Sequence, residues 1–339
     1  MGVWADSVEV GGSDGALFFD ISELCFIRRR GCRTSWARVS DKIHPMHHQT
    51  ITADDGEQLH VHVSGSGKPV LLLHGWTANH ASWAPLMAPL SQQFQVLRPD
   101  ARGHGGHALH VSQAPDVRRL GRDVINILDH FGIERTVAVG HSMGALTLWQ
   151  CVQDLGTARF SHLAFIDQSP KLLTDDSWRD GIYGDFDSAH AQRLVADLQA
   201  DFVEAVLRLI AFGLNGKARE TYLRNSSGWR AAREALQTID PQPAIAIWKS
   251  LVAADYRPVL PAIEVPTLLA YGTASNFYTE ATARFVAAHI AQARLSFYEG
   301  ADHCPHLLQP ERFVSELVAL ITGGTVACDP VYPPSRQVV

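Results

Sequence analysis

Cysteine is scarce in this chain of 339 residues, which contains only Cys25, Cys32, Cys151, Cys304 and Cys328. Their number is odd and no two form a Cys-x-x-Cys pair, so neither a disulfide framework nor a cysteine metal site is indicated. Long apolar runs are also missing, since none reaches the roughly 18 residues that a membrane helix needs. The N-terminus lacks the charged start and apolar core of a signal peptide. We therefore expect a cytoplasmic protein that does not enter a membrane.

An excess of positive charge is missing as well. The 29 Lys and Arg residues are outnumbered by 35 Asp and Glu residues, and the net charge is −6 at pH 7. This balance excludes the basic surface typical of nucleic-acid-binding proteins. Apolar residues make up 46% of the chain, which is enough for a full core in one large domain or two small ones. The composition leaves the oligomeric state open.

Strand-like and helix-like segments alternate along most of the chain. Short apolar runs predict strands at 68–76, 136–140, 162–167, 266–272 and 294–300, and residues 94–105 are interpreted as a strand that runs into a glycine-rich turn. A hairpin is expected around Asp55 and Gly56. Helical spacing predicts helices at 116–133, 142–156, 278–290 and 308–321. This order predicts an α/β fold with a mostly parallel, doubly wound sheet.

Residues 170–260 interrupt the alternation, because they contain helical stretches such as 200–214 and no convincing strand. We interpret them as a helical cap inserted over the carboxyl ends of the strands, where open α/β sheets bind ligands. The core then comprises 46–169 and 261–321. The ends are predicted to be a poorly patterned extension at 1–45 and a loose tail at 322–339.

The pentapeptide at 140–144, Gly-His-Ser-Met-Gly, lies between a predicted strand and a predicted helix. It has the form G-x-S-x-G, in which the serine occupies a sharp, strained turn and the glycines avoid a clash with it. The turn also aims the N-terminus of the next helix at the serine, where developing negative charge is favoured. Ser142 is therefore predicted to be a nucleophile, and a helix-capping serine is the alternative.

A serine nucleophile needs a base at neutral pH, and His303 follows the last predicted strand. His306 is a competing candidate. A metal pair of these two histidines has no third ligand at a suitable spacing, so no metal is predicted. The backbone N–H groups of Trp76, after the first buried strand, and of Met143 are the candidate oxyanion donors.

Asp167 closes an apolar strand, and a buried unpaired carboxylate is costly. A turn cap is the simple explanation. However, this strand follows the elbow helix, so in a parallel sheet Asp167 emerges at the same edge as Ser142. An imidazole N–H of His303 would supply the partner that the carboxylate needs.

With these motifs, residues 46–321 resemble the α/β-hydrolase superfamily. The resemblance rests on the His-Gly-Trp at 74–76, on the DARGHG sequence at 100–105, on the elbow around Ser142 and on the region near His303. It implies a Ser–acid–His triad in this chain order and a cap that sets substrate choice. The Trp after His-Gly and the Met after Ser look like those of small esterases, lactonases and perhydrolases.

The position of the acid departs from that branch. There the acid usually follows the strand that reads LLAYG here, but the turn at 272–276 holds no carboxylate and Glu280 lies farther on. Asp167 stands one strand earlier, which is similar to the cofactor-free 3-hydroxy-4-quinolone dioxygenases, whose His–acid dyad deprotonates the substrate. Those enzymes usually have His after the elbow serine, and Met143 here argues against an oxygenase.

The sequence thus predicts a serine hydrolase that acts without a cofactor on an ester, lactone or similar small acyl or aromatic substrate. Ser142 is the expected nucleophile, His303 the base and Asp167 the acid that orients it. Substrate contacts are assigned to Trp76, His141, Trp178 and Trp248. Packing inside the cap is the competing explanation for the cap aromatics. A cofactor-free dioxygenase and a non-catalytic binding protein of the same fold are the alternatives.

Overall fold

The computed structural model describes residues 47–324, so the predicted extension at 1–45 and nearly all of the tail lie outside the described residues. Eight strands form one sheet: β1 (His47–Thr52), β2 (Gln58–Ser64), β3 (Lys68–Leu73), β4 (Phe94–Asp100), β5 (Thr136–His141), β6 (Phe160–Ile166), β7 (Thr267–Gly272) and β8 (Ala293–Tyr298). Their order is β1-β2-β4-β3-β5-β6-β7-β8. Strand β2 pairs antiparallel with β1, through the expected hairpin, and with β4. The six strands from β3 to β8 are parallel to one another. The predicted mostly parallel α/β sheet is confirmed.

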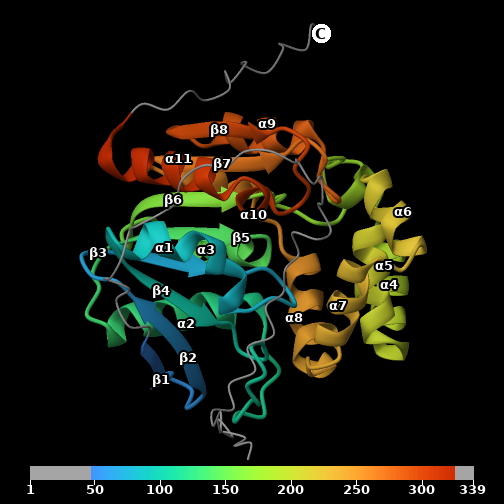
Figure 1. Ribbon diagram of the computed structural model, residues 1–339, viewed down its shortest axis with the longest axis horizontal. Helices are drawn as coiled ribbons and strands as arrows, with labels where there is room; N and C mark the ends of the chain where they lie inside the picture. Colours follow the sequence, from blue (N-terminus) through green and yellow to red (C-terminus); the bar gives the residue numbers. More distant parts are fainter. Residues whose placement is uncertain (1–46, 325–339) are drawn as a thin grey trace, which may run out of the picture.

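Helices cover both faces of this sheet (Figure 1). They are α1 (Ala84–Ser91), α2 (Val117–His130), α3 (Met143–Leu155), α9 (Glu280–His289), α10 (Pro305–Leu308) and α11 (Pro310–Thr322), with the short 3-10 helix η2 (His80–Trp83) before α1. None of the helices in the described range is both long and apolar enough to cross a lipid bilayer.

The apolar run of β3 shows why the central strands have no polar face. Val70 and Leu72 pack in the apolar cluster that includes residues of α1 and α11. Leu71 and Leu73 point the other way, into the cluster that includes α2 and α3. Successive strand side chains alternate between the faces, so a strand covered on both sides is apolar throughout.

The segment between β6 and β7 holds five α-helices: α4 (Ser188–Ala200), α5 (Phe202–Ala211), α6 (Gly216–Leu223), α7 (Ser227–Leu236) and α8 (Pro241–Ala253). They stand together beside the sheet (Figure 1). Four of them begin after an Asp or Asn whose side chain accepts a backbone N–H of the first turn, namely Asp187, Asp201, Asn215 and Asp240. Such residues satisfy N–H groups that a helix cannot pair internally.

Arg102, from the DARGHG sequence, links the hairpin turn to α2. Its side chain is 1% exposed and binds Asp123 on α2 through two hydrogen bonds of 2.5 and 2.6 Å, and Asp55 in the turn at 2.8 Å. The guanidinium lowers the pKa of the Asp55 carboxyl, while burial raises the pKa of Asp123. The network therefore keeps a buried carboxylate paired.

We expect Arg102→Met to lower the free energy of unfolding by about 3 kcal/mol, because it removes the buried cation of Asp123 and leaves that carboxylate only the partly exposed Arg119, at 3.0 Å. Urea unfolding at pH 7 measures this change. Arg122→Met is the matched control, since Arg122 forms an exposed pair with Asp54 and should contribute less than about 1 kcal/mol. Equal effects of the two substitutions would contradict the assignment.

Candidate active site

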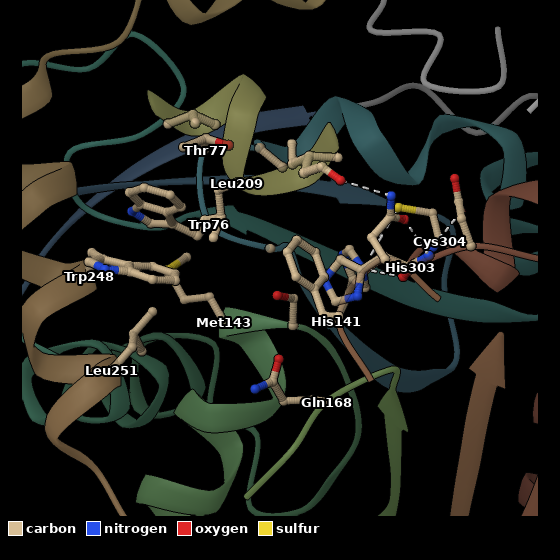
Figure 2. Close-up of a pocket in the computed structure, with 18 of the residues that line it drawn as sticks. Trp76, Thr77, His141, Met143, Gln168, Leu209, Trp248, Leu251, His303 and Cys304 are labelled. Carbon is tan, nitrogen blue, oxygen red and sulfur yellow. Dashed lines mark hydrogen bonds between the residues drawn. The ribbon is translucent and has the colours of Figure 1, made fainter. Parts of the chain in front are cut away.

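A cavity of about 170 Å³ lies between the carboxyl ends of the strands and the cap helices. The core contributes Ser142, His141 and His303 to its wall, and the cap contributes Leu209 and Trp248. Figure 2 shows the histidines on one side of the cavity and the tryptophan on the other. The cavity thus joins a polar end, built from loops of the sheet, to an apolar end built largely from the cap.

Ser142 occupies the strained turn that the pentapeptide predicts, with φ +51° between β5 and α3. A Cβ on Gly140 would lie 2.5 Å from the backbone of Gly144 and Ala145. A Cβ on Gly144 would lie 2.2 Å from the carbonyl oxygen of Leu73. The turn therefore requires both glycines, and it holds a serine in a backbone conformation that costs roughly 1–3 kcal/mol.

His303 lies in the loop between β8 and α10, and two side chains hold its backbone. Its N–H donates to Asn276 Oδ1 at 3.4 Å, and its carbonyl accepts the Nε2–H of His141 at 2.9 Å. Burial keeps the pKa of His141 well below its usual value, so this ring is a neutral donor. His141, which follows the strand into the elbow, thus fixes the loop that carries His303 as well as lining the cavity.

Asp167 has the partner that its position required. Its side chain is fully buried, and its Oδ2 accepts the Nδ1–H of His303 at 2.7 Å. The Gly272 N–H donates to Oδ1 at 3.1 Å, and the Ser275 hydroxyl donates to Oδ2 at 2.6 Å. Three donors aimed at the two oxygens stabilise the charged carboxylate. The expected contact between Asp167 and His303 is therefore present.

Ser275 is the site residue that sequence reasoning missed. It lies in the turn after β7 where an acid was expected, and its Oγ also accepts the N–H groups of Phe277 and Tyr278, each at 3.2 Å. These bonds aim the hydroxyl hydrogen at Asp167. The sequence signal for this role was the absence of a carboxylate from the turn after β7. A serine in that turn leaves room for the acid from the neighbouring strand.

The alternative acids and bases have other partners. Glu280 is exposed and pairs with Arg284 at 3.0 Å, and Asp302 Oδ1 accepts the Cys304 N–H at 2.9 Å. His306 is buried against Trp83 and is not among the residues that line the cavity. Burial lowers the pKa of His306 to about 3. The carboxylate that accepts the hydrogen bond of the His303 ring is that of Asp167.

The predicted oxyanion donors belong to residues beside Ser142. Met143 begins α3, and the first N–H groups of a helix have no partner within it. Trp76 follows Gly75, on which a Cβ would lie 3.4 Å from the Ser142 Cβ. Both Trp76 and Met143 line the cavity. The two residues therefore place backbone near the candidate nucleophile from separate loops.

Trp76 also meets the cap. Its indole N–H donates to the carbonyl oxygen of Ala244 at 2.9 Å, and its ring lies 4.7 Å from that of Trp248, between centroids. Figure 2 shows this aromatic pair on the wall opposite His303. Two of the assigned substrate contacts, Trp76 and Trp248, thus form one aromatic surface of the cavity.

The assignment of Trp178 to the substrate is not supported, because it is not among the residues that line the cavity. Its indole N–H donates to the Lys171 carbonyl at 2.9 Å, and its ring packs against Phe285 and under the Arg257 guanidinium. Its side chain connects the start of the cap segment to α9. These contacts give Trp178 a packing role between the cap segment and the core.

Comparisons with known proteins agree with this fold. A family model described as alpha/beta hydrolase fold matches residues 68–310. The chain is 28% identical over 276 residues to 3-oxoadipate enol-lactonase 1 of Acinetobacter baylyi, which covers 79% of this chain and 95% of that protein. It is 28% identical over 266 residues to a pimeloyl-[acyl-carrier protein] methyl ester esterase of Vibrio cholerae, covering 78% of this chain and 98% of that one. These alignments include the core and the cap segment alike.

Solved structures of similar shape include an esterase from Exiguobacterium antarcticum, with a TM-score of 0.69 and 22% identity. The match covers 80% of this chain and 98% of that one. At this identity the likeness supports the fold alone.

Proposed function

This chain belongs to the α/β hydrolase fold family, and from that premise we propose that it is a serine hydrolase of esters or lactones that works through an acyl-enzyme. The observation that carries the proposal is the 2.7 Å bond between His303 Nδ1 and Asp167 Oδ2, beside a cavity that Ser142 also lines. A buried carboxylate that fixes an imidazole on the wall of a cavity, which a strained serine also lines, fits the arrangement that activates a hydroxyl. The names of the relatives, a lactonase and an esterase, support the same reaction class.

In the proposed first half-reaction, Ser142 Oγ attacks the acyl carbon while His303 Nε2 takes the hydroxyl proton. The carbonyl π electrons move to oxygen, and the Trp76 and Met143 N–H groups stabilise that oxyanion. When it collapses, the bond to the alkoxy group breaks and His303 returns the proton to the departing oxygen. Asp167 keeps the proton of His303 on Nδ1 and stabilises the imidazolium.

In the second half-reaction, water replaces Ser142 as the nucleophile that gives its proton to His303. His303 removes one water proton as the oxygen attacks the acyl carbon, and the proton passes to Ser142 Oγ as the acyl bond breaks. For a lactone, the alcohol and the acid remain on one product molecule. The steps need no redox partner.

Apolar walls predict the substrate class. The cap end of the cavity is lined by Leu172, Ile182, Val206, Leu207, Leu209, Ile210, Leu236 and Leu251, with the rings of Trp229 and Trp248. Among residues 47–324, no Lys or Arg lines the cavity, so these residues provide no fixed cation there for a charged acyl group. We therefore propose a neutral acyl or aryl group of medium size.

The decisive experiment compares p-nitrophenyl esters of increasing acyl length, acyl homoserine lactones and 3-hydroxy-4-quinolones, with oxygen uptake recorded in parallel. Hydrolysis without oxygen uptake supports the proposal. Quinolone turnover that consumes oxygen would replace it with the dioxygenase, and inertness toward all substrates would favour a binding protein.

Trp248→Ala is expected to shift acyl-length preference, because it removes a ring from the aromatic surface shared with Trp76. We expect kcat/KM for long esters relative to acetate to rise by roughly tenfold, the scale of one or two methylene contacts. Trp178→Ala is the matched control, since this tryptophan is equally buried but outside the cavity. Both variants should lose stability, by about 3–5 kcal/mol, and only Trp248→Ala should change selectivity. A change of acyl-length preference in Trp178→Ala, with no change in Trp248→Ala, would contradict the assignment of the cavity.

A further inference from the structure

Histidines gather around Asp100, at the end of β4. The members of this group, which we call the Asp100 cluster, are His48, His60, His62, His80 and His107. They come from β1, β2, η2 and the loop after β4. Two ring pairs stack closely, with centroids 3.4 Å apart in each: His60 with His107 and His62 with His80.

The Asp100 carboxylate stands at the centre of the cluster and is 1% exposed. Its Oδ2 lies 2.9 Å from His80 Nδ1, 3.2 Å from His107 Nε2 and 3.7 Å from His62 Nε2. Two imidazolium rings stacked at 3.4 Å would repel each other, and one carboxylate cannot neutralise both. Imidazole is the commonest metal-ligating side chain, and it binds a metal in its neutral form.

We propose that His62, His80 and Asp100 form a site for a divalent transition-metal ion such as Zn²⁺, Co²⁺ or Ni²⁺. The atoms His62 Nε2, His80 Nδ1 and a carboxylate oxygen of Asp100 all lie within 4.8 Å of one another. Ligands about 2.1 Å from one tetrahedral ion are separated by roughly 3.4 Å. The rings of His62 and His80 are stacked with an interplanar angle of 15°, so binding requires them to turn out of this stack until both nitrogens face the ion. Two imidazoles with one carboxylate select ions of this borderline class over Ca²⁺ and Mg²⁺.

Groups behind the ligands support this role. The His80 backbone N–H donates to Asp100 Oδ1 at 2.7 Å, and the His107 Nε2–H is placed to donate to Oδ2 at 3.2 Å. Such bonds orient a ligating carboxylate. In the metal complex His80 carries its proton on Nε2 and His62 on Nδ1, so the protonation of each neutral ring changes at most in its tautomer.

The site is open to solvent and separate from the cavity. The side chains of His62 and His80 are 12% and 24% exposed, so an ion can enter and water can complete its coordination. None of the three ligands lines the cavity. An ion here would tie β2, η2 and the end of β4 together, and would stabilise the fold in proportion to its binding.

The test uses the full-length protein after treatment with a chelator. Calorimetric titration with Zn²⁺ should give one ion per chain, Co²⁺ should develop the visible bands of a tetrahedral site, and Zn²⁺ should raise the Tm. His62→Gln and His80→Gln should each weaken Zn²⁺ binding by at least about tenfold and remove the cobalt bands. His190→Gln is the matched control, because His190 is an exposed histidine beside Asp187 on α4, and it should bind as the wild type does.

Several results would overturn the proposal. They are wild-type Zn²⁺ affinity in both folded variants, equal affinity for Ca²⁺ and Zn²⁺, or cobalt spectra typical of six oxygen ligands. If circular dichroism shows that the variants are unfolded, the site is tested by chemical modification of the wild-type protein. Zn²⁺ should then protect His62 and His80, and not His190, from diethyl pyrocarbonate as mapped by mass spectrometry. Modification of His80 that is unaffected by Zn²⁺ would reject the site.

Discussion

Replacing Ser142 with Ala is expected to lower kcat for the best ester substrate by about 10⁵- to 10⁶-fold, the scale seen when a triad nucleophile is lost. Without Oγ there is no group to form the acyl-enzyme, and only binding and oxyanion stabilisation remain. The strained backbone at φ +51° does not depend on the hydroxyl, so the variant should fold. Steady-state hydrolysis and labelling by a fluorophosphonate probe measure the loss: the wild type should take up one label, and the variant none.

Ser161→Ala is the control for this substitution. Ser161 is half-buried in β6, and its hydroxyl donates to the Thr136 carbonyl at 3.2 Å, far along the strand from Asp167. The Ser161→Ala variant should still take up one fluorophosphonate label and should retain hydrolytic activity. If Ser142→Ala instead turns over substrate with oxygen uptake, the hydrolase proposal fails and a His303–Asp167 dyad would carry the reaction.

Replacing Asp167 with Asn should reduce kcat by up to about 10⁴-fold while the fold is retained. The amide keeps the shape of the carboxylate. However, its NH₂ group cannot accept the His303 Nδ1–H, so the ring is held in the wrong tautomer and the imidazolium loses its counter-charge. Ser275→Ala should produce a smaller loss of roughly tenfold to a hundredfold, because it removes one bond to the carboxylate and leaves the charge.

Glu280→Gln is the control for the acid, since Glu280 is exposed and paired with Arg284. Its effect on kcat should stay below about tenfold, as expected for a distant, screened charge. The order of loss is therefore Asp167→Asn, then Ser275→Ala, then Glu280→Gln, as measured by kcat on one ester at one pH. A loss in Glu280→Gln that equals the loss in Asp167→Asn would reject the assignment of the acid.

Local patterns were sufficient for much of the fold. The central strands are covered on both faces, so their apolar runs are visible without knowing their partners. The turn at Ser142 needs glycine at both flanks for steric reasons that involve residues close in sequence or in the adjacent strand, and these requirements are written in the pentapeptide. The location of Asp167 at the same edge of the sheet as Ser142 could be predicted, because a parallel sheet brings the carboxyl ends of successive strands to one edge.

Residues whose roles depend on distant contacts could not be predicted in this way. Trp178 and Trp248 are both buried tryptophans of the cap segment, and their roles differ because Trp248 lines the cavity beside Trp76 whereas Trp178 packs on Phe285 of α9. Ser275 has no signature of its own, since its role arises from the 2.6 Å contact with a carboxylate 108 positions away. The stacked histidines around Asp100 likewise come from strands and loops that no local period connects.

The hydrogen bond from the Trp76 indole to Ala244 has a mechanical consequence. The backbone N–H of Trp76 is a proposed oxyanion donor, and its side chain is hydrogen-bonded to α8. A displacement of α8 would therefore also displace the loop that carries this donor. The position of α8 and the backbone at Trp76 are therefore set together, so a substitution that shifts Ala244 would also shift one of the two proposed oxyanion donors.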